Sequence, residues 1–198
     1  MQVGDISSFD AVLGIGIGLG LAAAAGFRVF VPLLVLSIAG RAGYVPLSSG
    51  FEWIGTTPAL VAFGAATLLE VGAYYVPWLD NLLDTLAAPA AVLAGIVASA
   101  SVMTELPPLV KWSIAIIAGG AAAGAVHAST SLLRLKSTAT TGGLANPLVA
   151  STELAGSALL SVLAIVVPLV ALVLLALVLF GIYRLSRRLL RRPHAAST

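Results

Sequence analysis

The sequence contains no cysteine and few charged residues. Of its 198 residues, 9% are charged and 60% are hydrophobic, whereas about a quarter of the residues in a soluble domain are charged. The absence of cysteine excludes disulfides, thiolate metal sites and cysteine nucleophiles. The shortage of charge argues against a soluble fold, because a core of this length is too small to bury so much apolar surface. We therefore expect that surface to face lipid.

The chain also lacks the short motifs of common enzymes. It contains no H-E-x-x-H and no G-x-S-x-G, and its two histidines are far apart in the sequence. The glycine pair near residue 142 is not followed by the lysine that a P-loop requires. We therefore expect no enzymatic activity, no cofactor, no metal ion and no nucleic-acid partner.

Six apolar segments predict an all-α, polytopic membrane helix bundle. A membrane-spanning helix needs about 20 apolar residues. The first and fourth segments are longer than this, so they must tilt, kink or protrude. Pro32 is the expected kink in the first, and Pro168 the expected break between the last two. The segments run roughly over 11–39, 58–77, 87–104, 109–135, 149–167 and 169–186.

We predict a single transmembrane domain over 1–198 that ends in a basic tail, 187–198. The acidic N-terminus lacks the basic region of a secretory signal, so we expect the first span to be retained. Five spans, with one long kinked helix at the C-terminal end, are the alternative.

The placement of basic residues favours six spans over five. With six, Arg134, Lys136 and the C-terminal arginines fall on one side, whereas Arg41 and Lys111 fall on the other. The positive-inside rule makes the first side cytoplasmic, so we expect both termini inside a bacterial inner membrane. The C-terminal arginines share one helix face and are expected to contact anionic lipid headgroups. They are Arg184, Arg187, Arg188, Arg191 and Arg192. A homodimer through glycine stripes is a further expectation.

The two halves of the chain share a pattern. Small residues recur on one helix face in the first and fourth segments, and each stripe ends at a basic residue, Arg28 or His127. The second and fifth segments each start near a proline and hold one glutamate, Glu70 or Glu153. A repeat of three spans would be inverted in the membrane, as in many secondary transporters. Small-residue stripes are also common packing surfaces, so a 3+3 inverted repeat remains one of two interpretations.

Arg28 and Glu70 lie well inside their apolar segments. A lone charge at the bilayer centre costs at least about 2.5–3.5 kcal/mol on insertion scales, so we expect these two side chains to pair near the midplane. Together with His127 and Glu153 they are candidates for a substrate or ion pathway. A structural ion pair that only orders the bundle is the alternative.

Two polar stretches carry further candidates. In LKSTATTGGLANP, residues 135–147, hydroxyls and glycines precede a helix start, as in anion-binding turns. The candidates there are Thr140, Thr141, Gly142, Gly143 and Asn146. An ordinary capped turn explains the same residues. PWLDNLLDTLAAP, residues 77–89, is amphipathic and predicts an interfacial helix. Its carboxylates, Asp80 and Asp84, lie one turn apart, either on a solvated face or around a divalent cation.

Three stretches of the sequence resemble a known family. They are GFRVFVPLL, LLEVGAYYVPWLDNLLDTL and TATTGGLANPLVASTE, and together they resemble a bacterial group of small polytopic membrane proteins, domain of unknown function 4126. The resemblance extends over roughly 11–170. It implies an integral membrane protein and supplies neither an activity nor catalytic residues. The residues themselves favour a transporter or channel for a small solute or ion, with a non-transporting scaffold or lipid-interacting protein as the alternative.

Overall fold

The chain folds into helices joined by short loops. The computed structural model describes residues 8–73 and 77–190, and this part contains no strand. The all-α class predicted from the sequence is therefore confirmed. The elements are α1 (Ser8–Phe27), α2 (Phe30–Arg41), the 3-10 turn η1 (Glu52–Gly55), α3 (Thr57–Ala73), α4 (Pro77–Val102), α5 (Pro108–Ile114), the π-helical turn η2 (Ala115–Gly119), α6 (Gly120–Thr141), α7 (Asn146–Val166) and α8 (Pro168–Leu190).

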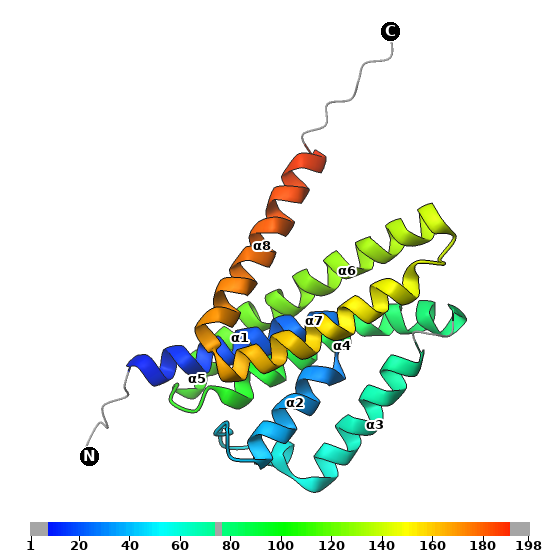
Figure 1. Cartoon of the computed structure of the whole chain (residues 1–198). Helices are drawn as coiled ribbons and strands as arrows, with labels where there is room; N and C mark the ends of the chain where they lie inside the picture. The colour runs from blue at the N-terminus through cyan, green and yellow to red at the C-terminus, as the bar shows by residue number, and fades with distance from the viewer. Residues whose placement is uncertain (1–7, 74–76, 191–198) are drawn as a thin grey trace, which may run out of the picture.

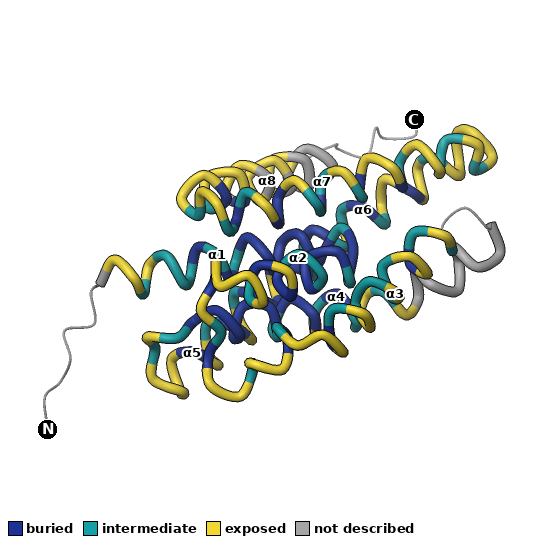
Figure 2. Tube along the Cα trace, turned by 60° about the horizontal axis from the view of Figure 1, so that its bottom comes forward, coloured by how far each residue is buried: buried dark blue, intermediate teal, exposed yellow. Residues whose placement is uncertain are grey.

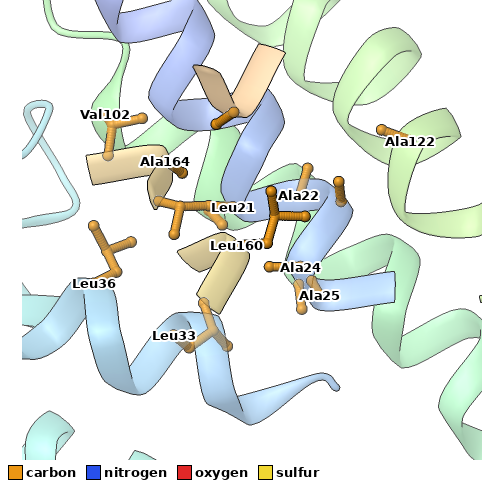
Figure 3. Close-up of a cluster of buried hydrophobic side chains, with 14 of the residues drawn as sticks. Leu21, Ala22, Ala24, Ala25, Leu33, Leu36, Val102, Ala122, Leu160 and Ala164 are labelled. Carbon is orange, nitrogen blue, oxygen red and sulfur yellow. The ribbon is translucent and has the colours of Figure 1, made fainter. Parts of the chain in front are cut away.

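Helix α1 is the centre of the bundle. It packs against α4, α6, α7 and α8, while α2 and α3 lie together on one side and α8 leans away from the rest (Figure 1). The buried segments gather around α1, and the exposed ones follow α8 and the outer faces of α3 and α6 (Figure 2). In the close-up, Leu21, Ala22 and Ala24 of α1 surround Leu160 of α7, and Leu33 and Leu36 of α2 belong to the same cluster (Figure 3).

Small residues let the neighbours of α1 approach its backbone. A Cβ atom added at Gly26 would lie 2.5 Å from the Ala123 carbonyl oxygen, and one at Gly20 would lie 2.7 Å from the Ala164 Cβ. Such short distances are typical of small-residue packing between membrane helices. The predicted glycine stripes therefore pack inside the chain, and a homodimer must use a different surface.

The outer surface of the helices is apolar, as a membrane protein requires. Among the described residues, three stretches are long and apolar enough to cross a bilayer: Phe9–Phe27, Pro108–Thr141 and Asn146–Val166. Shorter apolar helices cover Phe30–Arg41, Thr57–Ala73, Leu86–Val102 and Pro168–Gly181. These helices account for all six predicted segments, while the number of crossings and the inverted repeat stay predictions.

The first predicted segment is two helices. It breaks between Phe27 and Phe30, and α2 leaves the break at a sharp angle to α1 (Figure 1). Pro32 explains the position, because a proline lacks the N–H that would bond to the carbonyl four residues earlier, here that of Arg28, and its ring clashes with that carbonyl. The break therefore lies one turn before the proline. The predicted break at Pro168 is confirmed between α7 and α8.

Two other boundaries differ from the prediction. The fourth segment is one helical stretch over 108–141 that contains η2, so residues 135–141 are helical and the turn is only 142–145. The threonines there prolong α6 because their hydroxyls bond to its own carbonyls. The predicted interfacial helix over 77–89 is the first part of α4, which continues through Pro89. Membrane helices tolerate an internal proline where neighbours satisfy the freed carbonyl.

Candidate functional site

Four charged side chains are buried together where α1 breaks. We call Arg28, Glu70, Arg134 and Glu153 the charge cluster; their exposed fractions are 2%, 8%, 6% and 4%. They come from the α1–α2 break, α3, α6 and α7 in that order. By formal charge the cluster is neutral, with two guanidinium groups and two carboxylates. Charges buried in a membrane protein are costly and usually mark a functional site.

Glu70 caps the first turn of α2 from a different helix. The N-cap residue Val29 makes no side-chain cap of its own. Instead Glu70 Oε1 accepts a hydrogen bond from the Val29 N–H at 2.8 Å, and Oε2 accepts one from the Phe30 N–H at 3.1 Å. The first N–H groups of a helix have no partner within it, and the helix dipole favours a negative charge there. Glu70 and Ala59 are the only buried residues of α3. The Glu70 carboxylate is therefore the main buried polar contact between α3 and the start of α2.

Arg28 forms its ion pair with Glu153. The Arg28 Nη2 atom lies 3.4 Å from Glu153 Oε2 and donates a hydrogen bond of 2.8 Å to the Ala150 carbonyl oxygen. The sequence predicts Glu70 as the partner, whereas in the described part of the chain Glu153 is the carboxylate within ion-pair distance and Glu70 binds the neighbouring backbone N–H groups. Depth along the apolar segments favours Glu70 as the partner of Arg28. In the structure, however, α7 packs beside both α1 and α2 and brings Glu153 to the break.

Arg134 is the member of the cluster that the sequence analysis missed. The positive-inside argument places it in a cytoplasmic loop. It lies instead within α6 and donates hydrogen bonds to Glu153 from two nitrogens. Its Nε atom is 3.0 Å from Glu153 Oε1, and its Nη2 atom donates to Oε2. The spacing of the two residues from the α6–α7 turn is the sequence signal that could have identified this pair. Arg134 lies seven residues before Thr141, the end of α6, and Glu153 lies seven residues after Asn146, the start of α7.

The other sequence candidates lie outside the cluster. His127 is half-buried within α6, with its ring Nε2 3.5 Å from the Ser131 hydroxyl. The Thr140 and Thr141 hydroxyls donate to the carbonyls of Lys136 and Ser137. Gly142 ends α6 in the left-handed conformation, with φ of 64°.

Gly143 also has a positive φ, of 89°, and Asn146 is the first residue of α7 with its side-chain amide donating to Thr138. The hydroxyls, glycines and amide around residue 142 thus form a capped helix turn, which is the alternative to an anion cradle. The side chains of Asp80 and Asp84 lie outside the described residues.

Polar contacts elsewhere are structural or exposed. Lys111, predicted at the side of the membrane opposite to the C-terminal arginines, is buried, and its Nζ donates to the Ser48 hydroxyl at 2.7 Å. On α8, Arg184 and Arg187 are exposed, whereas Arg191 and Arg192 and the side chain of Arg188 lie outside the described residues. Within the described part, no three histidine, aspartate or glutamate side chains gather as metal ligands do.

Comparison with known proteins identifies a family without identifying an activity. The family model described as a domain of unknown function, DUF4126, matches residues 15–188. This is most of the chain, so the protein belongs to that family. Neither the curated proteins nor the solved structures contain a significant match.

Proposed function

We propose that this member of the DUF4126 family carries a small solute or ion across the membrane through the charge cluster. The observation that carries the proposal is the break between α1 and α2, where Arg28 is buried and Glu70 binds the first backbone N–H groups of α2. Discontinuous helices with charged residues at the break are how many secondary transporters build their binding sites. The proposal assigns no enzymatic activity to the chain.

The cluster favours an anionic solute. Glu153 is shared by two arginines, whereas Glu70 binds only backbone N–H groups among its hydrogen-bond partners. Glu70 is therefore the carboxylate that a solute can replace at the least cost. Once it leaves, the charge cluster holds one negative charge fewer, which favours an anion in its place. The hydroxyl of Thr67, three residues before Glu70 on α3, is buried without a partner and supplies a further donor.

The proposal also places the chain in a bacterial inner membrane with both termini cytoplasmic. The basic residues favour this orientation, and the exposed Arg184 and Arg187 would then contact anionic headgroups of the inner leaflet. Single cysteines in the two tails test it, because an impermeant thiol reagent should reach both from the same side. Labelling from opposite sides would show an odd number of crossings and overturn this orientation.

Flux measurements in proteoliposomes test the transport proposal. We expect the purified protein to conduct chloride or acetate, with proton movement recorded in parallel. Glu70→Gln should change that flux in a variant that still folds, since it removes the negative charge that competes with the solute. Glu52→Gln is the matched control, because the Glu52 carboxylate also accepts a backbone N–H, that of Gly50, but is exposed and lies in η1, outside the cluster.

A structural role is the second candidate. Arg134 donates to Glu153 from two nitrogens, and Arg28 donates to the Ala150 carbonyl. These contacts are sufficient for a cluster whose role is to hold the helices together. A scaffold of this kind moves no solute, and its Glu70→Gln variant melts at a lower temperature. Absence of flux from the wild type combined with that loss of stability would overturn the transport proposal.

A further inference from the structure

Polar residues line the facing sides of α6 and α7. On α6 they are His127, Thr130, Arg134, Ser137 and Thr141, and on α7 they are Asn146, Glu153, Ser157 and Ser161. Their spacings place each set along one helix face. The Arg134–Glu153 pair and the hydrogen bond from the Asn146 amide to Thr138 show that these faces meet. We call these nine residues the polar seam.

Burial along the polar seam increases from the α6–α7 turn to the charge cluster. Thr141 is exposed at the α6–α7 turn, Ser137 and Asn146 are partly buried, and Arg134 and Glu153 are buried. Beyond them Ser157 is fully buried, and its hydroxyl donates to the Ala24 carbonyl of α1 at 2.9 Å. The seam is therefore exposed at the turn and covered by α1 at Ser157, while His127 on the α6 side is half-buried.

Two polar atoms near the open end have no partner. Ser137 Oγ and Asn146 Oδ1 are buried without a hydrogen bond, whereas Thr130, Ser157 and Ser161 deeper in the seam all donate to carbonyls. Buried polar atoms in native proteins nearly always find a partner, and water supplies it where protein does not. The outer face of the same part of α6 is apolar and exposed, at Leu132, Leu133 and Leu135, as expected for contact with lipid.

We propose that the polar seam is a water-filled half-channel that leads from the turn at 142–145 to the charge cluster. Its open end favours small hydrophilic anions, because the exposed Lys136 lies near it, whereas the charge of Arg134 is balanced by Glu153 within the seam. The identity of the cargo rests on the proposed function. Access of water and small anions does not, since it depends only on the seam itself.

The lack of cysteine makes the test direct, because each single-cysteine variant reports one position. Ser137→Cys and Thr130→Cys lie on the seam, and Leu135→Cys and Leu132→Cys are matched controls close by on the apolar face of α6. Each variant in proteoliposomes is exposed to an anionic and a cationic methanethiosulfonate, added on the side of the α6–α7 turn. Only variants with the wild-type melting temperature are compared, and Ser137→Cys decides alone if Thr130→Cys fails to fold.

We expect the seam cysteines to react about tenfold faster or more than their controls, because a thiol ionises in water and not against lipid. The anionic reagent should react faster than the cationic one. Equal rates at Ser137→Cys and Leu135→Cys, or faster reaction of the cationic reagent, would overturn the half-channel. Reactive seam cysteines without any flux would overturn the transport proposal alone, whereas flux with an unreactive seam would overturn the half-channel alone.

Discussion

Arg134 and Glu153 face each other across the α6–α7 turn, each seven residues from the end of its helix. This pairing fixes the register of the two helices. It also holds Glu153 where Arg28, from the break after α1, can reach the same carboxylate. One carboxylate therefore connects three helices inside the apolar bundle.

Removing the charge of Glu153 should destabilise the fold strongly. Glu153→Gln leaves two buried guanidinium groups without their shared carboxylate, and breaking a buried ion pair from one side costs about 3–5 kcal/mol. The free energy of unfolding in detergent measures this loss. Glu105→Gln, at an exposed carboxylate, should leave stability unchanged. A Glu153→Gln variant as stable as the wild type would show that the cluster does not hold the helices together.

Gly26 should tolerate no side chain. In Gly26→Ala the new Cβ would lie 2.5 Å from the Ala123 carbonyl oxygen and 2.6 Å from the Val126 Cβ, and overpacking of this kind typically costs about 1–3 kcal/mol. The matched control is Gly156→Ala in α7, where no atom lies within 4 Å of the added Cβ. There the higher helix propensity of alanine should stabilise by up to about 1 kcal/mol. Melting temperatures that shift in the same direction for both would contradict the packing of α1.

Gly142 should be replaceable at a cost set by backbone conformation alone. It ends α6 with φ of 64°, and no atom lies near an added Cβ. Gly142→Ala should cost roughly 1–2 kcal/mol, the penalty of the left-handed conformation for an L-residue. Gly142→Asn should cost less, because asparagine adopts that conformation more readily. Thermal melting of the two variants ranks them, and the reverse order would contradict the capped turn.

The Ser48 hydroxyl should stabilise the fold, because it accepts a hydrogen bond from a buried ammonium group. Ser48→Ala leaves the Lys111 Nζ without this acceptor, and loss of a hydrogen bond to a charged group costs about 1.5–3 kcal/mol. The double variant Ser48→Ala/Lys111→Met removes both polar groups and should recover part of the loss. Chemical unfolding of both variants and the wild type measures it. A double variant less stable than Ser48→Ala would show that Lys111 has a more important partner.

The sequence predicted the helices well because hydropathy and proline act locally. Every predicted apolar segment corresponds to helices, and Pro168 marks a real break. Pro32 also causes a break, although its effect falls at Arg28, because a proline disturbs the carbonyl one turn earlier.

The partners within the charge cluster were harder to predict. Hydropathy gives the depth of Arg28 and Glu70 along their own helices, but it does not say which helices are neighbours. Arg134 was missed for a related reason, since basic residues close to a predicted span end resemble loop residues. The equal spacing of Arg134 and Glu153 from the α6–α7 turn was present in the sequence, but it becomes informative only when the end of α6 is known.

The wide separation of Arg28 from Glu153 in the sequence has a consequence for biosynthesis. Residue 28 leaves the ribosome 125 residues before residue 153, so the first helix enters the membrane long before its ion-pair partner exists. Glu70 is made only 42 residues after Arg28, and it binds the backbone directly beside that arginine. The nascent chain therefore acquires an acidic neighbour for Arg28 early, and the pairing with Glu153 is completed only after α6 and α7 have been inserted.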